Sequence, residues 1–304
     1  MKDNVLSETF LLSNGLKIPK LGLGTWMIED DKAAQAIENA VEIGYRHFDT
    51  AQGYENEEGV GEGIRFCGLK RQEVFVTTKL DASIKDFDGT QAAIADSLKR
   101  LGLDYIDLMI IHAPQPWTNF REDNRYFEGN LAAWRAMESA YKEGLIRAIG
   151  VSNFQQVDLE NLLKNGDVKP MVNQILAHVS NTPFALIDYC QRHNILVEAY
   201  SPIGHGEMLK NNLVSEMASR YEVSIAQLCI RYCLQLDMLP LPKTANPAHM
   251  KSNAELNFEI SEQDMKILKN VEHIKNYGEA SIFPVYGGKL NKDGRYSPRD
   301  FFEE

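Results

Sequence analysis

The residues of this sequence that could together carry out acid chemistry are four polar side chains: Asp49, Tyr54, Lys79 and His112. Tyrosine is a weak acid with a reference pKa of about 10, and a neighbouring ammonium lowers that pKa because it favours the phenolate. Lys79 could supply the ammonium, with Asp49 paired to it and keeping it in place. A neutral His112 could donate a hydrogen bond to a substrate oxygen. The group therefore suits proton delivery to a carbonyl oxygen as negative charge develops on it.

Asp49, Lys79 and His112 fall at the ends of predicted strands, and Tyr54 lies in the loop five residues after Asp49. Short β-forming runs, several of them continuously apolar as in parallel strands buried on both faces, recur along the chain. The predicted strands are Leu21–Thr25, Arg46–Thr50, Val74–Lys79, Ile106–His112, Ala148–Asn153, Met171–Ile175, Leu196–Ser201 and Met238–Lys243. Each of the four residues alone has a structural explanation, as a helix cap, a loop aromatic, a solvated strand end or a satisfied histidine. The predicted proton-transfer chemistry therefore depends on whether the fold brings the four side chains close together.

Helical patterns lie between these runs, at Asp30–Ile43, Asp86–Leu101, Gly129–Glu143, Thr182–His193, Ser224–Gln235 and Pro247–Asn253. The first three end at a glycine, as helix termini often do. Alternating strands and helices predict an α/β protein with a closed (β/α)8 barrel, whose function sits at the C-terminal ends of the strands. A doubly wound open sheet is the alternative. It is disfavoured because no Gly-x-Gly-x-x-Gly follows the first strand.

The 304-residue chain carries 32 Lys and Arg against 43 Asp and Glu, a net charge of −11. This acidic balance, without a long basic cluster, argues against a nucleic-acid partner. The chain does not open on a signal-type apolar run, and its four cysteines form no Cys-x-x-Cys pair. We expect one domain over residues 1–304, cytoplasmic, without membrane contact or bound metal. Its polar tail, about residues 275–304, is expected to pack over one end of the barrel.

A series of short motifs in a fixed order runs over nearly the whole chain. They are Asn14-Gly-Leu-Lys-Ile-Pro19, Leu21-Gly-Leu-Gly-Thr-Trp26, Gly44-Tyr-Arg-His-Phe-Asp-Thr-Ala51, Tyr54-Glu-Asn-Glu57, Leu103-Asp-Tyr-Ile-Asp-Leu108, Ile111-His-Ala-Pro114, Ile149-Gly-Val-Ser-Asn-Phe154, Asn173-Gln174, Ala199-Tyr-Ser-Pro202 and Leu241-Pro-Lys-Thr244. In this order they resemble the aldo-keto reductases, and most of all the prokaryotic small-carbonyl, diketogluconate-reductase-like members. One motif alone would carry little weight, but the ordered series is specific.

The resemblance implies a (β/α)8 barrel that binds a nicotinamide dinucleotide without a Rossmann fold and reduces an aldehyde or ketone by hydride transfer. It implies Tyr54 as the general acid, Lys79 and Asp49 as the pair that tunes it, and His112 as the residue that orients the substrate. Substrate contacts are expected from Trp26, Tyr54, His112 and Trp117.

The resemblance also implies a cofactor site. Its residues are Gly24, Thr25, Trp26, Asp49, Ser152, Asn153, Gln174, Tyr200, Ser201, Pro202, Ile203, Gly204, Lys243, Thr244, His249 and Asn253. Ser152, Asn153 and Gln174 would hold the carboxamide of the nicotinamide, and Tyr200 would stack on its ring. Residues 201–204 would line the pyrophosphate loop.

The phosphate end departs from the family pattern. Lys243 and Thr244 match a pair that grips the 2′-phosphate of NADP, but His249 stands where the family often has arginine. Histidine is only partly charged near neutral pH and lacks the planar guanidinium fork. NADP(H) is therefore the expected cofactor, with weaker discrimination and possible use of NAD(H).

The substrate end departs as well. No tryptophan follows Lys79 closely, and Ala113 follows His112 where an aromatic residue is common. Trp117 and Phe120 could refill this space. Two other functions stay open: a catalytically silent cofactor-binding regulatory module, and a non-redox barrel enzyme such as a lyase or isomerase. The complete set of four acid-chemistry residues favours an active reductase of a small carbonyl compound, and a monomer is expected.

Overall fold

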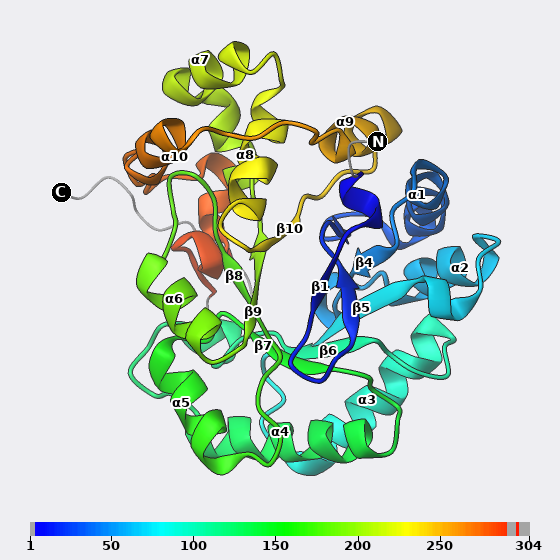
Figure 1. Ribbon diagram of the computed structural model, residues 1–304. Helices are drawn as coiled ribbons and strands as arrows, with labels where there is room; N and C mark the ends of the chain where they lie inside the picture. The colour runs from blue at the N-terminus through cyan, green and yellow to red at the C-terminus, as the bar shows by residue number, and fades with distance from the viewer. Residues whose placement is uncertain (1–3, 291–295, 298–304) are drawn as a thin grey trace.

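The computed structural model describes residues 4–290 and 296–297. At its centre lies a ring of eight parallel strands in chain order (Figure 1). The strands are β3 (Leu23–Gly24), β4 (His47–Asp49), β5 (Phe75–Leu80), β6 (Leu108–Ile111), β7 (Ile149–Ser152), β8 (Val172–Leu176), β9 (Leu196–Tyr200) and β10 (Leu239–Leu241). The ring closes where Gly24 bridges to Lys243 and the Gly24 amide donates to the Pro242 carbonyl at 3.1 Å. The predicted closed (β/α)8 barrel is confirmed, and the open sheet is wrong.

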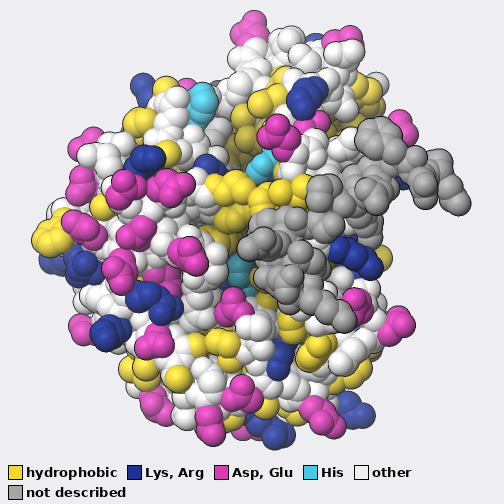
Figure 2. Space-filling model, turned by 180° about the vertical axis from the view of Figure 1, so that it is seen from behind, with side chains coloured by type: hydrophobic (Ala, Val, Ile, Leu, Met, Phe, Trp, Pro, Cys, Tyr) yellow, Lys and Arg dark blue, Asp and Glu magenta, His cyan; other side chains and the backbone are white. Residues whose placement is uncertain are grey.

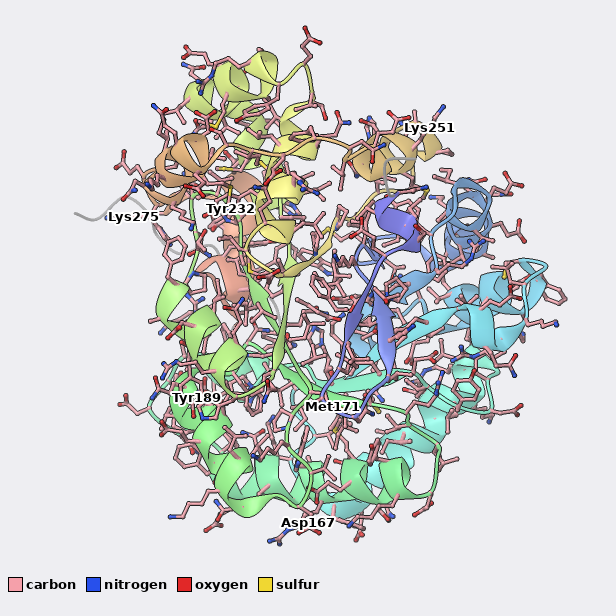
Figure 3. All side chains as sticks on the ribbon, viewed as in Figure 1. Asp167, Met171, Tyr189, Tyr232, Lys251 and Lys275 are labelled. Atoms are coloured by element: carbon pink, nitrogen blue, oxygen red, sulfur yellow. The ribbon has the colours of Figure 1, made fainter. Side chains whose placement is uncertain are left out.

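Helices surround the ring. They are α1 (Asp30–Ile43), α2 (Glu57–Phe66), α3 (Phe87–Leu101), α4 (Phe127–Lys142), α5 (Gln156–Asn165), α6 (Phe184–Arg192), α7 (Asn212–Arg220), α8 (Ile225–Leu234), α9 (Pro247–Ala254) and α10 (Glu262–Lys269). The six predicted helices are present with slightly shifted ends, and α1 and α3 end at left-handed glycines as expected. Figure 3 shows side chains crowding the ring, while Lys251 on α9 lies at the periphery. The barrel is therefore a packed core with a helical outer layer.

Helices α2, α5, α7 and α10 are not among those predicted. For α2 the reason is physical: its sequence contains glycines, which disfavour helix interiors. A Cβ at Gly59 would collide with the Asp30 carbonyl of α1, and one at Gly61 would collide with the Leu101 carbonyl of α3. The glycines thus let α2 approach both neighbours closely, and tertiary packing overrides the intrinsic helix propensity.

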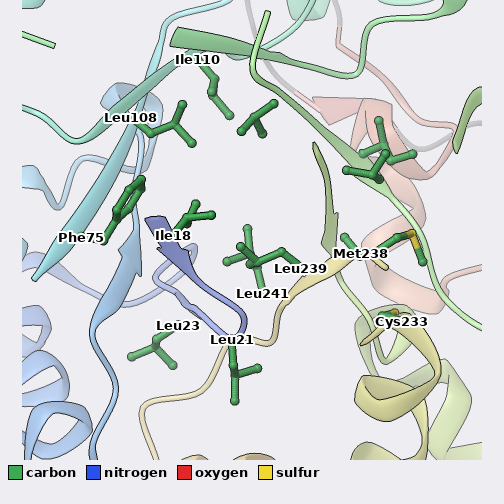
Figure 4. Packing of buried hydrophobic residues seen from close by; sticks show 14 of the residues in the cluster. Ile18, Leu21, Leu23, Phe75, Leu108, Ile110, Cys233, Met238, Leu239 and Leu241 are labelled. Atoms are coloured by element: carbon green, nitrogen blue, oxygen red, sulfur yellow. The ribbon is translucent and has the colours of Figure 1, made fainter. Parts of the chain in front are cut away.

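An N-terminal hairpin, also not predicted, closes one mouth of the barrel. Strands β1 (Thr9–Leu11) and β2 (Lys17–Pro19) pair antiparallel and lie in front of the ring in Figure 1. The turn signal Asn14-Gly15 marks it, with Gly15 at φ +86°. Ile18 of β2 is fully buried and lies among Phe75, Leu108 and Leu239 of the strands (Figure 4). This mouth is sealed by apolar packing, which leaves the opposite mouth for function.

The described part of the C-terminal tail packs over that opposite mouth. It contains the short turns Gly278–Ile282 and Pro284–Tyr286, and Tyr277 and Tyr286 stack with ring centroids 4.5 Å apart. Phe283 contacts Trp26 edge-on at 4.9 Å between centroids. Strands β11 (Lys289–Leu290) and β12 (Tyr296–Ser297) form a small antiparallel pair. Residues 291–295 and 298–304 of the predicted tail lie outside the described residues.

Gly61→Ala should lower the free energy of unfolding by about 2 kcal/mol, because the added methyl must push α2 away from the α3 backbone. Urea unfolding followed by circular dichroism measures this change. Glu62→Ala is the matched control, since Glu62 is exposed on the same helix and its replacement should change stability by about 0.5 kcal/mol or less. Equal stability of the two variants would refute the close-packing explanation for α2.

Candidate active site

A cavity of about 510 Å³ lies at the C-terminal ends of the strands. Figure 2, viewed from behind, shows hydrophobic side chains and histidines gathered in the middle of this face, with acidic side chains around them. The predicted site residues that line the cavity are Gly24, Trp26, Asp49, Tyr54, His112, Trp117, Ser152, Asn153, Gln174, Tyr200, Ser201, Pro202, Ile203 and Lys243. Residues far apart in sequence therefore meet in one concave site.

The acid-chemistry residues meet at the floor of this cavity. The Lys79 ammonium is buried, donates to the Asp49 carboxylate, and donates to the Thr50 carbonyl at 2.9 Å. The same ammonium lies 4.7 Å from the centroid of the Tyr54 ring. The His112 ring stands edge-on to Tyr54, with 5.6 Å between ring centroids. The ends of β4, β5 and β6, together with the short helix Gln52–Tyr54 that follows β4, thus bring together the four residues on which the predicted chemistry depends.

The charges of these residues follow from their burial. Burial raises the pKa of Tyr54, and although the Lys79 charge opposes this, the net pKa lies above its usual value. The Lys79 charge thus acts on the pKa of Tyr54 in the expected direction, but burial outweighs it. Burial tends to lower the pKa of Lys79, but Asp49 and Tyr54 outweigh it and raise that pKa. At neutral pH, Tyr54 is thus a neutral phenol beside a firmly charged ammonium.

His112 is held neutral. Burial and the charges of Lys79 and Lys85 lower the pKa of His112 well below its usual value. The Lys85 ammonium donates to the Ala113 carbonyl at 2.8 Å and so fixes the chain just after His112. Trp117 packs edge-on against the His112 ring at 5.0 Å, and Phe120 packs behind Trp117 at 5.2 Å. Of the two aromatic residues expected to refill the substrate end, Trp117 lines the cavity and Phe120 supports it.

Polar side chains beside this group bind one another. The Asn153 amide donates to the His112 carbonyl and to the Ser152 hydroxyl, both at 3.0 Å, and accepts from the Tyr200 hydroxyl at 2.8 Å. The Ser152 hydroxyl donates to the backbone carbonyl of Gln174 at 2.9 Å. These bonds fix the edges of the cavity where the resemblance places the nicotinamide carboxamide.

The far end of the cavity is formed by the loop after β9 and by Lys243. Ser201 and His205 have left-handed backbones, with φ +50° and +51°, which turn the loop sharply over the cavity. Burial lowers the pKa of Lys243. Thr25, Gly204, Thr244, His249 and Asn253 do not line this cavity, although the resemblance assigns them to the cofactor. His249 is exposed on α9, whereas Asn253 is buried on the same helix.

Some lining residues are absent from the predicted site. They are Met27, Gly53, Asp81, His205, Gly206, Leu209, Leu241, Pro242, Phe283, Pro284, Val285 and Tyr286. Gly206 lies two residues after the predicted loop 201–204, and a glycine there indicates a continued turn, so the sequence could have included it. The residues from 283 to 286 carry no local signal for this site. They reach it through tertiary contacts such as the 2.6 Å hydrogen bond between the hydroxyls of Tyr286 and Ser201.

One further buried acid, Glu198 of β9, lies next to this group and was not predicted. Its carboxyl accepts from the Gln174 amide at 2.7 Å, and its other oxygen has no partner among the described residues. Burial and the nearby Asp49 charge raise the pKa of Glu198 to about 8. The sequence signal is an acid inside an otherwise apolar strand, Leu196-Val-Glu-Ala-Tyr200.

Comparison with known proteins identifies the chain. The model of the Aldo/keto reductase family matches residues 20–273. The chain belongs to this family. It is 41% identical over 262 residues to the glyoxal reductase of Bacillus subtilis (strain 168), covering 86% of this chain and 91% of that protein. It is also 39% identical over 272 residues to the 9,11-endoperoxide prostaglandin H2 reductase of Trypanosoma cruzi (strain CL Brener), covering 88% and 92%.

Solved aldo/keto reductases share the fold. The Brucella melitensis enzyme superposes with a TM-score of 0.81 at 36% identity, covering 87% of this chain and 99% of that one. The Bombyx mori enzyme in complex with NADP gives 0.80 at 32% identity, covering 90% and 95%. This aldo/keto reductase is thus an oxidoreductase that carries out NAD(P)H-dependent carbonyl reduction. None of the described helices is long and apolar enough to cross a membrane.

The raised pKa of Glu198 makes stability depend on pH. The folded carboxyl keeps its proton up to about pH 8, whereas the unfolded one releases it near its ordinary value of 4.5. The folded state therefore binds more protons across this window, and the free energy of unfolding should fall as pH rises through it. Urea unfolding between about pH 5 and 8 should show a shallower fall for Glu198→Gln than for the unchanged protein. Parallel curves would show that Glu198 does not titrate in this way.

Proposed function

We propose that this aldo/keto reductase reduces a small aldehyde, ketone or dicarbonyl with Tyr54 as the proton donor and with NADPH preferred. The observation that carries the proposal is the buried contact of Lys79 with both Asp49 and the Tyr54 ring at the cavity floor. That arrangement favours the phenolate left after Tyr54 gives up its proton, because a fixed cation faces the developing negative charge.

The other residues have distinct roles. His112 is neutral and lines the cavity, so it can donate a hydrogen bond to the substrate oxygen that receives the Tyr54 proton. Trp26, Trp117 and Phe283 give the substrate end aromatic walls that exclude water from the reacting carbonyl. The bound nicotinamide supplies the hydride. Asp49 holds Lys79 in place and takes no proton itself.

The lining residues fit a nicotinamide dinucleotide. Tyr200 offers an aromatic surface, Gln174 an amide, and Lys243 a cation at the far end of the cavity. A cation there supports preference for the 2′-phosphate of NADP, and a structural relative from Bombyx mori binds NADP. The exposed His249 supports a weaker preference that leaves NADH usable. Thr244 and Asn253 would extend the adenosine end beyond the cavity.

The similarity to a glyoxal reductase supports a small, reactive dicarbonyl as substrate. We propose a cytoplasmic monomer, and the net charge of −11 argues against a nucleic-acid partner. The complete set of Tyr54, Lys79, Asp49 and His112 argues against a silent regulatory module, because cofactor binding alone would not need Tyr54 as a proton donor or Lys79 beside it.

Tyr54→Phe should lower kcat by about 100-fold or more while leaving cofactor affinity nearly unchanged, since only the transferred proton is lost. The assay follows the loss of reduced-nicotinamide absorbance with a dicarbonyl such as glyoxal. Tyr105→Phe is the matched control, because the Tyr105 hydroxyl is buried without a partner among the described residues and lies outside the cavity. Unchanged turnover of Tyr54→Phe would disprove the proton-donor role.

His249→Arg should lower Kd for NADPH about tenfold and leave that for NADH within about twofold, because a guanidinium adds a charge and a fork for the 2′-phosphate alone. Fluorescence titration with each reduced cofactor measures both constants. His193→Arg, on a helix end away from the cavity, controls for added positive charge. An equal gain for both cofactors would contradict the assignment of His249 to the phosphate end.

A further inference from the structure

Glu198 is an acid inside the barrel wall that the proton-transfer residues leave unused. It lies opposite Gln174 in the register of β8 and β9, and none of its side chain is exposed. Its backbone partner on the other side is Leu239 of β10, so that side offers it no charge. Burying a carboxyl this deeply lowers the stability of the folded state, and an apolar side chain at this position would avoid that loss. Its hydrogen bond to Gln174 is the one contact that explains its presence.

The Gln174 amide nitrogen carries two hydrogens and has two acceptors. One is Asp49 Oδ2 at 2.8 Å, and the other is Glu198 Oε2 at 2.7 Å. Asp49 is ion-paired with Lys79 and therefore stays an acceptor, which decides which end of the amide is nitrogen. With both hydrogens used, the carbonyl oxygen is the amide atom left to accept a hydrogen bond in the cavity that Gln174 lines.

We propose that Glu198 is a positioning residue, which holds the Gln174 amide with its carbonyl oxygen presented to the carboxamide of the nicotinamide cofactor. The proposal rests on the proposed placement of that carboxamide at Gln174. Without Glu198, one amide hydrogen loses its acceptor, and Gln174 can rotate about its terminal bond, which is a soft torsion. The amide would then present the wrong atom for part of the time.

A carboxyl suits this task better than an apolar group. Burial raises the pKa of Glu198 to about 8, so at neutral pH it is mostly a neutral acid that still has lone pairs for Gln174. Asp49 therefore keeps its charge for Lys79 without a second negative charge beside it. Glutamine at position 198 also offers an acceptor oxygen, whereas methionine, of similar length, does not.

The test is cofactor binding without turnover. Trp26 and Trp117 line the cavity, so quenching of tryptophan fluorescence reports NADPH binding directly. Glu198→Met should raise Kd about tenfold, the loss typical of one misplaced hydrogen bond. Glu198→Gln should stay within about twofold of the unchanged protein. Glutamine and methionine fill similar space, but only glutamine offers an acceptor oxygen. A normal Kd for Glu198→Gln beside a raised Kd for Glu198→Met would therefore show that the hydrogen bond matters and not the packing.

A double-mutant cycle shows whether Glu198 acts through Gln174. Gln174→Met should itself weaken NADPH binding, and adding Glu198→Met to it should weaken binding no further. Additive losses would overturn the proposal, as would a Glu198→Gln variant that binds as poorly as Glu198→Met. If Gln174→Met binds NADPH normally, the placement of the carboxamide fails instead, which keeps the two failures distinct.

Thr77→Val is the control for general damage to the barrel. Thr77 lies on β5 inside the ring and bonds the buried His47 ring at 2.9 Å, outside the cavity lining. Its replacement should lower stability and leave the Kd for NADPH unchanged. Should Glu198→Met fail to fold, Glu198→Leu takes its place as the variant without an acceptor: it should also raise the Kd for NADPH about tenfold, and a normal Kd would overturn the proposal.

Discussion

The buried ion pair of Lys79 with Asp49 is the interaction on which the rest of the site depends. Both side chains are nearly inaccessible, with 1% and 4% of their surfaces exposed. Such a pair survives only when its remaining donors and acceptors are satisfied, and the Thr50 carbonyl and the Gln174 amide do this. Removing one partner would leave an uncompensated charge in the barrel, a cost of about 3–5 kcal/mol. Lys79 and Asp49 are therefore needed both for the proposed proton transfer and for the stability of the barrel.

Burial and this ion pair together set the protonation of the neighbouring groups. Burial and the Lys79 charge keep His112 neutral, and burial keeps Tyr54 protonated despite that charge. Burial raises the pKa of Glu198, and the nearby Asp49 charge adds to this effect because a second negative charge would be unfavourable there. Burial beside one cation and one anion thus leaves the nearby groups neutral, which is the state that a proton donor and a hydrogen-bond donor require.

The sequence predicts the barrel well because its strands are apolar runs whose last residues carry the polar groups. Asp49, Lys79 and His112 could be placed at one end of the barrel from this pattern alone. Helix α2 could not be predicted, because its glycines serve contacts with α1 and α3 that local propensity does not contain. His205 and Tyr286 were missed for a related reason: their positions depend on a sharply turned loop and on the docking of the chain end. Glu198 had a visible signal, an acid in an apolar strand.

The catalytic residues and the walls of the substrate end come from different segments of the chain. Asp49, Lys79 and His112 lie on strands or directly follow them, and Tyr54 lies in the short helix Gln52–Tyr54 after β4. In contrast, Trp117 and residues 283–286 come from a loop and from the chain end. The hairpin closes the other mouth, so the part of the chain that seals the barrel differs from the parts that wall the substrate end. Sequence drift in loop and tail can therefore reshape the choice of carbonyl compound while the catalytic floor stays as it is. Substrate choice, set by the loop and the tail, can thus change separately from the proton-transfer residues at the cavity floor.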